Sequence, residues 1–311
     1  MTVRIINADV MEGLRQLPDE SVHCVVTSPP YWGLRDYGVE GQIGLEATPE
    51  AFVGRMVDVF REVRRVLRGD GTCWMNMGDS YAGSGRGGNP TEETSTLEGG
   101  QATQRAAAGF KQKDLMGMPW RVALALQADG WWLRSDIIWA KPNPMPESVT
   151  DRPTKSHEYV FLLTKAERYY YDAEAIKEEG SGRTPGNVNQ DGKGADNHRI
   201  ANGGNGIFAA QQRPQLERNK RSVWFIATSP FPEAHFATFP PELPEICIKA
   251  GCPVGGTVLD PFSGAGTTCL VADRLQRNGI GIELNPEYAA MAERRINGDR
   301  GALLDIMEIA E

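Results

Sequence analysis

Short apolar runs alternate along the chain with longer stretches in which apolar residues recur every three or four positions. The short runs are typical of buried strands, and the longer stretches are typical of amphipathic helices. The predicted strands are residues 3–6, 22–27, 72–77, 133–140, 158–164, 257–260 and 279–283. The predicted helices, after a short amphipathic turn near residues 10–17, are 48–67, 118–129, 241–250, 267–276 and 286–296. This alternation predicts an α/β fold built on one doubly wound sheet.

Two stretches interrupt this pattern. Residues 79–114 are rich in Gly, Ser, Thr and Gln, which predicts a mobile insertion. Residues 177–221 are poor in large apolar side chains and carry eight Lys or Arg against five Asp or Glu. We therefore expect a core domain in two parts, residues 1–176 and 223–311, separated by an inserted region over residues 177–222.

Composition restricts the class of protein. The 311 residues are 40% hydrophobic and 24% charged, which is ordinary for a soluble globular protein. No apolar run approaches the roughly 20 residues that a membrane helix needs. The N-terminus enters a strand pattern at once, without the layout of a signal peptide, so we expect a cytoplasmic protein with no membrane partner.

Cysteine content and charge add two expectations. The five cysteines are scattered without a Cys-x-x-Cys pair and the four histidines are dispersed, so the sequence predicts reduced core thiols and no metal site. The net charge of −8 is unusual for a protein that binds nucleic acid. It does not exclude that class, because only one face of the protein needs to be positive.

A glycine turn follows the predicted strand at residues 257–260. Residues 260–268 read Asp-Pro-Phe-Ser-Gly-Ala-Gly-Thr-Thr, without the Gly-Lys-Ser/Thr ending of a P-loop and without Gly-x-Gly-x-x-Gly spacing. A cationic cofactor that carries no pyrophosphate explains both absences. Glu283 ends the next strand, where an acid that binds ribose hydroxyls is expected. The alternative is that the glycines only form a tight turn and Glu283 is a surface acid.

A rigid polar segment, Ser28-Pro29-Pro30-Tyr31, ends the predicted strand at residues 22–27. Consecutive prolines fix the backbone, so the Ser28 hydroxyl and the Pro29 carbonyl can hold the exocyclic amine of a base. Tyr31 offers a ring for stacking on a base that leaves the duplex, and Trp32 can form a wall of the pocket. The alternative is a proline-terminated strand with core aromatics.

Together, the two segments resemble the motifs of the DNA amino-methyltransferases, which transfer a methyl group from S-adenosylmethionine to the exocyclic nitrogen of cytosine or adenine. The base segment precedes the cofactor segment, as in the beta class, and the resemblance covers nearly the whole chain except the two insertions. It implies a mostly parallel, seven-stranded, Rossmann-like methyltransferase sheet. It also implies cofactor contacts from Asp9, Phe239, Asp260, Pro261, Phe262, Ser263, Gly264, Gly266, Thr267 and Glu283. For Asp9, a helix N-cap is the competing role.

The resemblance implies catalytic roles for Ser28, Pro29, Pro30 and Tyr31. Serine in the first position is found mostly in cytosine-N4 enzymes and aspartate mostly in adenine-N6 enzymes, so we predict methylation of cytosine N4 in duplex DNA, with adenine N6 as the alternative. No cysteine follows a proline near either segment, which disfavours the cytosine-C5 mechanism. An RNA or protein methyltransferase and a catalytically silent DNA-binding module are the remaining alternatives, although related RNA and protein enzymes normally have the cofactor motif first.

The resemblance makes double-stranded DNA the expected partner and residues 177–222 the expected target-recognition region. It leaves open a homodimer and a cognate restriction endonuclease in a prokaryotic or phage-infected cell. The candidate DNA contacts are Trp32, Lys141, Arg152, Lys155, Arg199, Arg213, Arg218, Lys220 and Arg221. Solvated surface charge is the competing interpretation for Lys141, Arg152 and Lys155.

Overall fold

Residues 1–34, 38–82, 109–180, 217–229 and 238–310 are described by a computed structural model. The chain forms two units, the first consisting of residues 1–172 and 222–311 and the second of residues 173–221. The bounds of the second unit lie close to those of the inserted region, residues 177–222, whose role stays a prediction. Most of the insertion predicted at residues 79–114 lies outside the described residues.

An eight-stranded sheet runs through the first unit in the order β1-β10-β9-β2-β3-β5-β4-β8. The strands are β1 (Val3–Asn7), β2 (Val22–Thr27), β3 (Leu67–Met77), β4 (Trp132–Ala140), β5 (His157–Thr164), β8 (Val223–Phe225), β9 (Thr257–Asp260) and β10 (Asn278–Glu283). Only β5 runs antiparallel to its neighbours within this sheet. The parallel strands bring their C-terminal ends to one edge, where open α/β sheets bind ligands.

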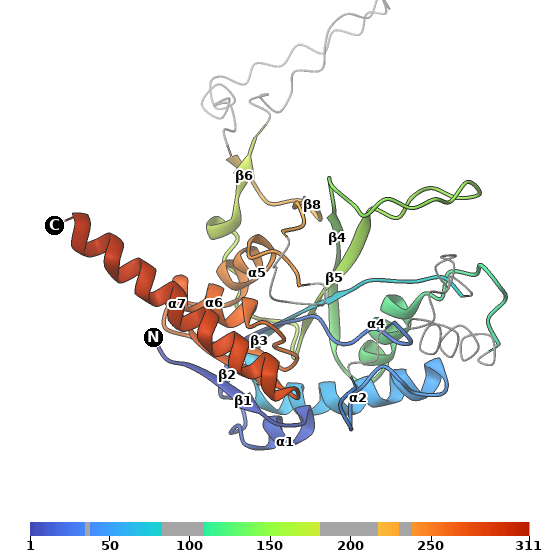
Figure 1. Ribbon diagram of the computed structural model, residues 1–311, viewed down its shortest axis with the longest axis horizontal. Coiled ribbons are helices and arrows are strands. Elements are labelled where there is room, and N and C mark those ends of the chain that lie inside the picture. Colours follow the sequence, from blue (N-terminus) through green and yellow to red (C-terminus); the bar gives the residue numbers. More distant parts are fainter. Residues whose placement is uncertain (35–37, 83–108, 181–216, 230–237, 311) are drawn as a thin grey trace, which may run out of the picture. The chain divides into compact units, whose positions relative to one another are not determined.

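Helices cover both faces of the sheet (Figure 1). One layer contains α1 (Val10–Arg15), α2 (Pro49–Val66) and α4 (Met118–Ala128), and the other contains α5 (Glu242–Gly251), α6 (Thr267–Arg274) and α7 (Pro286–Ala310). The apolar face of α2 shows why the helix forms there: Phe52, Met56, Val59, Phe60 and Val63 are fully buried at helical spacing. The predicted doubly wound, mostly parallel α/β fold is confirmed.

Two details of the sheet differ from the prediction. It has eight strands rather than seven, because Val223–Phe225 pairs with β4 at the edge. In addition, β3 begins at Leu67 and includes Gly69-Asp70-Gly71, whereas the sequence predicted a helix up to residue 67 and a strand only from residue 72. A Cβ atom at Gly71 would lie 2.6 Å from the Leu67 side chain and 3.0 Å from the carbonyl oxygen of His23. Glycine is therefore needed for close packing inside the strand rather than for a turn.

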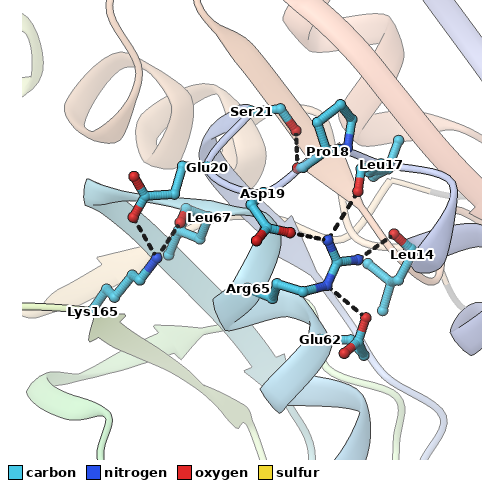
Figure 2. Close-up of polar contacts among 10 residues, drawn as sticks. All are labelled: Leu14, Leu17, Pro18, Asp19, Glu20, Ser21, Glu62, Arg65, Leu67 and Lys165. Atoms are coloured by element: carbon cyan, nitrogen blue, oxygen red, sulfur yellow. Dashed lines mark hydrogen bonds and ion pairs between the residues drawn. The ribbon is translucent and has the colours of Figure 1, made fainter.

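Two basic side chains, Lys165 and Arg65, hold the chain where β2 and β3 begin (Figure 2). These are the N-terminal ends of the parallel strands, opposite the C-terminal ends where open α/β sheets bind ligands. Lys165 donates to Glu20 and to the carbonyl oxygen of Leu67, both at 2.9 Å. Arg65 of α2 donates to two carbonyl oxygens and two carboxylates, those of Leu14, Leu17, Asp19 and Glu62. These contacts fix the start of the strand whose other end carries Ser28.

The second unit contains a short 3₁₀ helix, η1 (Glu174–Ile176), and an antiparallel pair of two-residue strands, β6 (Glu178–Glu179) and β7 (Glu217–Arg218). Within the described part of the chain, no helix is long and apolar enough to cross a membrane. The five cysteines are free and buried. No group of three or more His, Cys, Asp or Glu side chains in the described ranges is arranged to hold a metal ion.

Candidate active site

The two segments singled out in the sequence lie on neighbouring strands. β2 and β9 are parallel, with Cys24 opposite Val258 and Val25 opposite Leu259. This register brings Ser28 and Pro261 to the same edge of the sheet, although more than 200 residues separate them in the chain. The cofactor turn and the base segment therefore adjoin each other because of the strand order.

Asp260 connects the two segments. The carboxylate is buried, with 1% of the residue exposed, and accepts hydrogen bonds from Thr27 Oγ1 (2.7 Å), Thr268 Oγ1 (2.8 Å) and the Phe262 amide (3.1 Å). Burial raises the pKa of Asp260 to about 6, although the hydrogen bonds from Thr27 and Thr268 lower it. Asp260 lines the candidate pocket, but these hydrogen bonds show that its carboxylate chiefly organises the turn.

The glycines of the turn are required by the geometry. Gly264 and Gly266 have φ values of +51° and +73°, which side-chain-bearing residues rarely adopt. A Cβ atom at Gly266 would lie 2.8 Å from the Cβ atom of Ala292 in α7. The turn can therefore pack directly under α7, and Gly266 serves as the residue preceding α6 rather than as part of the pocket lining.

Glu283 lies at the C-terminal end of β10 and faces the turn. Its Oε2 atom accepts the Gly264 amide at 2.8 Å, and its Oε1 atom accepts the Asn285 amide at 2.9 Å. Burial raises the pKa of Glu283. The carboxylate is held in one orientation by two backbone amides, and its remaining lone pairs are available to donors in the pocket.

A single cavity of about 770 Å³ extends across both segments. That volume lies within the usual range for small-molecule sites. Fourteen predicted site residues line it: Asp9, Ser28, Pro29, Pro30, Tyr31, Lys141, Phe239, Asp260, Pro261, Phe262, Ser263, Gly264, Thr267 and Glu283. Asp9 also serves as the N-cap of α1, accepting the Met11 amide at 2.9 Å, so both of its competing roles agree with the geometry.

The base segment contacts an acid that was not among the predicted site residues. Tyr31 Oη donates to Glu158 Oε2 at 2.8 Å and lies 3.4 Å from Ser28 Oγ. Lys141 Nζ is paired with Glu158 Oε1. Burial, together with the nearby Glu158 charge, raises the pKa of Tyr31 well above its usual value. Asn76 of β3, also missed from the sequence, lines the same cavity and donates to the Tyr159 carbonyl at 3.1 Å.

The predicted role of Trp32 as a wall contacting DNA does not agree with its burial. Only 2% of the residue is exposed, and its Nε1 atom donates to the Glu46 carbonyl at 2.8 Å. Its ring lies 6.2 Å from that of Phe110, between centroids. Trp32 belongs to the hydrophobic core, against which Tyr31 of the base segment packs.

The other candidate DNA contacts differ in their surroundings. Arg152 pairs with Glu147 at 2.7 Å and stacks over the Tyr81 ring, and Lys155 donates to the Asp79 carbonyl. These contacts connect the segment before β5 to the segment after β3. In the second unit, Arg218 and Arg221 both pair with Glu178. Arg199 and Arg213 lie outside the described residues, and contacts of the remaining residues with DNA, including Lys220, stay predictions.

The residues present fit a cationic nucleoside cofactor. The cavity offers the carboxylates of Asp9 and Glu283 and the aromatic rings of Phe239 and Phe262. Among the described residues that line it, Lys141 is the only cation, and it is paired with Glu158 at the base segment. A pyrophosphate would therefore lack a cationic partner at the glycine turn, whereas the positive charge of a sulfonium is compatible with the nearby carboxylates and ribose hydroxyls would find hydrogen-bond acceptors. A glycine turn with these acceptors, next to the prolyl segment on the adjacent strand, is the arrangement expected of an S-adenosylmethionine-dependent amino-methyltransferase.

Comparison with known proteins agrees with this class. The chain belongs to the N6/N4 methyltransferase family, described as DNA methylase, whose family model matches residues 22–294. The Type II methyltransferase M.XycI of Xanthomonas campestris pv. cyanopsidis is 47% identical over 302 residues, which cover 97% of this chain and 90% of the relative. M.SmaI of Serratia marcescens, also a Type II methyltransferase, is 47% identical over 294 residues, with 94% and 90% covered.

Solved structures share the fold. TTHA0409 of Thermus thermophilus, described as a putative DNA modification methylase and complexed with S-adenosyl-L-methionine, has a TM-score of 0.61 at 25% identity, covering 96% of this chain and 94% of that one. PvuII DNA methyltransferase, described as cytosine-N4-specific, has a TM-score of 0.63 at 20% identity, with 98% and 93% covered, which shows likeness of fold alone. The predicted family, fold and cofactor are thus confirmed, and the protein is an S-adenosylmethionine-dependent DNA methyltransferase.

Proposed function

We propose that the protein methylates the N4 atom of cytosine within a short site in duplex DNA. The observation that carries this proposal is Ser28 in the first position of the prolyl segment, at the end of β2 and facing the cavity that also holds the cofactor turn. Serine in this position is typical of the cytosine-N4 branch of the family, whereas aspartate is typical of the adenine-N6 branch.

An exocyclic amine is a poor nucleophile because its lone pair is delocalised into the ring. In the proposed reaction, Ser28 Oγ and the Pro29 carbonyl accept the two amine hydrogens and so localise the lone pair on nitrogen. The prolines hold both acceptors in place before the base arrives, and Tyr31 borders the base. S-adenosylmethionine would supply an electrophilic methyl group: the N–C bond would form as the S–CH3 bond breaks, with S-adenosylhomocysteine as the leaving group and one amine proton released to solvent, without a covalent enzyme intermediate.

The cofactor contacts follow from the lining of the cavity. We assign the ribose hydroxyls to Glu283, the neighbourhood of the adenine to Asp9 and the methionine moiety to Phe239, with the turn at residues 260–267 forming the floor. The positions of these residues around one cavity support the assignment. The carboxylate of Glu283 is already oriented by the Gly264 and Asn285 amides, so little ordering is needed on binding.

The deciding experiment is mass spectrometry of nucleosides from DNA of cells that express the protein. We expect N4-methylcytosine, and N6-methyladenine instead would transfer the proposal to the other branch of the family. Ser28→Ala and Tyr31→Ala should abolish methylation while the affinity for S-adenosylmethionine, measured by calorimetry, stays close to that of the wild type. Equal loss of cofactor affinity would contradict the division of labour between the two segments.

We also propose that residues 177–222 read the target sequence and that the enzyme protects DNA from a restriction endonuclease of the same site in a prokaryotic cell. The names of the Type II relatives support the second part of this proposal, and the local excess of basic residues over residues 177–221 supports the first. Exchanging residues 177–222 with those of a relative that has a different target should transfer the sequence specificity while keeping the modified base. An unchanged target would place recognition elsewhere. Sedimentation analysis would decide whether the enzyme works as a monomer or a homodimer.

A further inference from the structure

The Tyr31 hydroxyl lies between Ser28 and Glu158, which come from segments far apart in the chain. Tyr31 Oη donates to Glu158 Oε2 at 2.8 Å, and Ser28 Oγ lies 3.4 Å from the same hydroxyl. A Cβ atom at Gly78 would lie 2.8 Å from Tyr31 Cε2 and 3.3 Å from Glu158 Cδ. The absence of a side chain at Gly78 therefore lets the tyrosine ring and the acid meet.

The hydrogen bonds in this group have one permitted direction. The Glu158 carboxylate, paired with the Lys141 ammonium, can only accept. Tyr31 has one hydroxyl hydrogen and gives it to Glu158, so in the contact with Ser28 the serine must be the donor. Burial raises the pKa of Tyr31 well above its usual value, so the phenol keeps its hydrogen.

This direction has a consequence for the acceptor role of Ser28. With its hydrogen turned towards Tyr31, Ser28 Oγ presents only lone pairs to the cavity, which suits the hydrogens of an amine. We propose that Glu158, held by Lys141, is a positioning residue that sets the hydrogen-bond direction through Tyr31 so that Ser28 accepts from the target base. This proposal depends on the proposed function in one respect: it assumes that the group bound by Ser28 is an amine.

Glu158→Gln tests the direction with almost no change in shape. In the variant, Lys141 orients the amide so that its oxygen faces the ammonium and its nitrogen faces Tyr31. The Tyr31 hydroxyl oxygen must then accept a hydrogen bond from the new side-chain amide at position 158, so the tyrosine hydroxyl hydrogen points to Ser28 Oγ. The hydroxyl hydrogen of Ser28 is thereby turned towards the amine of the base, where it opposes the amine hydrogens. We expect kcat for methyl transfer to fall on the order of 100-fold, as when one preorganised hydrogen bond is lost from an active site. The Kd for S-adenosylmethionine should stay unchanged.

A second substitution distinguishes an effect of hydrogen-bond direction from a general structural defect. Tyr31→Phe removes the hydroxyl whose hydrogen bond is reversed in Glu158→Gln. The double variant should therefore have a higher kcat than Glu158→Gln alone. Two independent structural losses would multiply instead. A matched control is Glu245→Gln on α5, which removes the charge from a surface Glu–Lys pair and should leave kcat unchanged. A double variant slower than Glu158→Gln, or a kcat of Glu158→Gln within twofold of the wild type, overturns the proposal.

Tyr31→Phe alone supplies an independent test if Glu158→Gln does not fold. It removes the hydroxyl through which Glu158 sets the direction of the hydrogen bonds, so kcat should fall at least fivefold while the Kd for S-adenosylmethionine stays unchanged, and a kcat within twofold of the wild type overturns the proposal. Total labelled methyl transfer into DNA is the readout, so the result does not depend on which base is modified. An active Ser28→Ala enzyme would instead refute the contact between Ser28 and the amine. That result would contradict the proposed function, whereas the Glu158 and Tyr31 variants test only the direction of the hydrogen bonds.

Discussion

Thr27 and Asp260, 233 residues apart in the chain, are joined by a buried hydrogen bond of 2.7 Å from Thr27 Oγ1 to Asp260 Oδ1. Thr27 directly precedes the base segment, and Asp260 is the first residue of the cofactor turn. Because Asp260 also accepts from Thr268 at the start of α6, one carboxylate fixes two strand ends and a helix start. The spacing of the base segment and the cofactor turn therefore depends on this contact.

Thr27→Val should weaken both the fold and the turn. The substitution keeps the shape but leaves a buried carboxylate with one donor fewer, which costs about 1.5–3 kcal/mol for a hydrogen bond to a charged group. We expect a matching loss in the free energy of unfolding, measured by urea denaturation, and weaker binding of S-adenosylmethionine by calorimetry.

Thr164→Val is the matched control for this loss. Thr164 is also fully buried on a strand, but its hydroxyl donates to the neutral Ala166 carbonyl at 2.8 Å. Removing that bond should cost about 1 kcal/mol and leave cofactor affinity unchanged. If the two variants lost equal stability, the Asp260 carboxylate would not carry the special cost assigned to it.

Stability should depend on pH through Asp260. Burial raises its pKa from 3.8 to about 6, so the folded state holds the proton more tightly than the unfolded state. For an acid with a raised pKa, stability is greatest at low pH and declines as the pH rises through this interval. Between about pH 4 and about pH 7 we expect the wild type to lose on the order of 3 kcal/mol relative to Asp260→Asn in urea unfolding. Parallel pH profiles of the two proteins would contradict this assignment.

Some residues of this site can be predicted from the sequence and others cannot, for physical reasons. Asp260–Thr268 and Ser28–Tyr31 are local patterns whose chemistry is contained in adjacent residues, so they are recognisable without a structure. Glu158 is not, because it is the second residue of a largely apolar strand and meets Tyr31 only through the strand order of the sheet, at a separation of 127 residues in the chain. A charged residue at the start of a buried strand is the one available signal. Trp32 shows the converse error, since an aromatic next to a motif was assigned to the pocket although it packs in the core.

Glu283→Gln should weaken cofactor binding without affecting the fold greatly. The amide retains one acceptor oxygen for the Gly264 or the Asn285 amide, but it cannot serve both amides and a ribose hydroxyl. Loss of a charged hydrogen bond predicts a Kd for S-adenosylmethionine roughly 10- to 100-fold higher. Glu287→Gln, an exposed acid four residues further on, is the control and should leave this Kd unchanged. Similar Kd values for both variants would count against Glu283 as a cofactor ligand.

Gly78→Ala should impair methyl transfer through crowding alone. The added Cβ atom would lie 2.8 Å from the Tyr31 ring, closer than real Cβ contacts allow, so the ring must move away from Glu158. We expect kcat to fall at least tenfold, because small displacements in active sites commonly have an effect of this size. The Kd for S-adenosylmethionine should stay unchanged because the cofactor turn is not altered.

Gly54→Ala is the control, since Gly54 lies in α2 with no atom within 4 Å of its added Cβ. It should stabilise the helix by about 1 kcal/mol and leave kcat as it is. Full activity of Gly78→Ala would mean that the contact between Tyr31 and Glu158 does not govern the reaction.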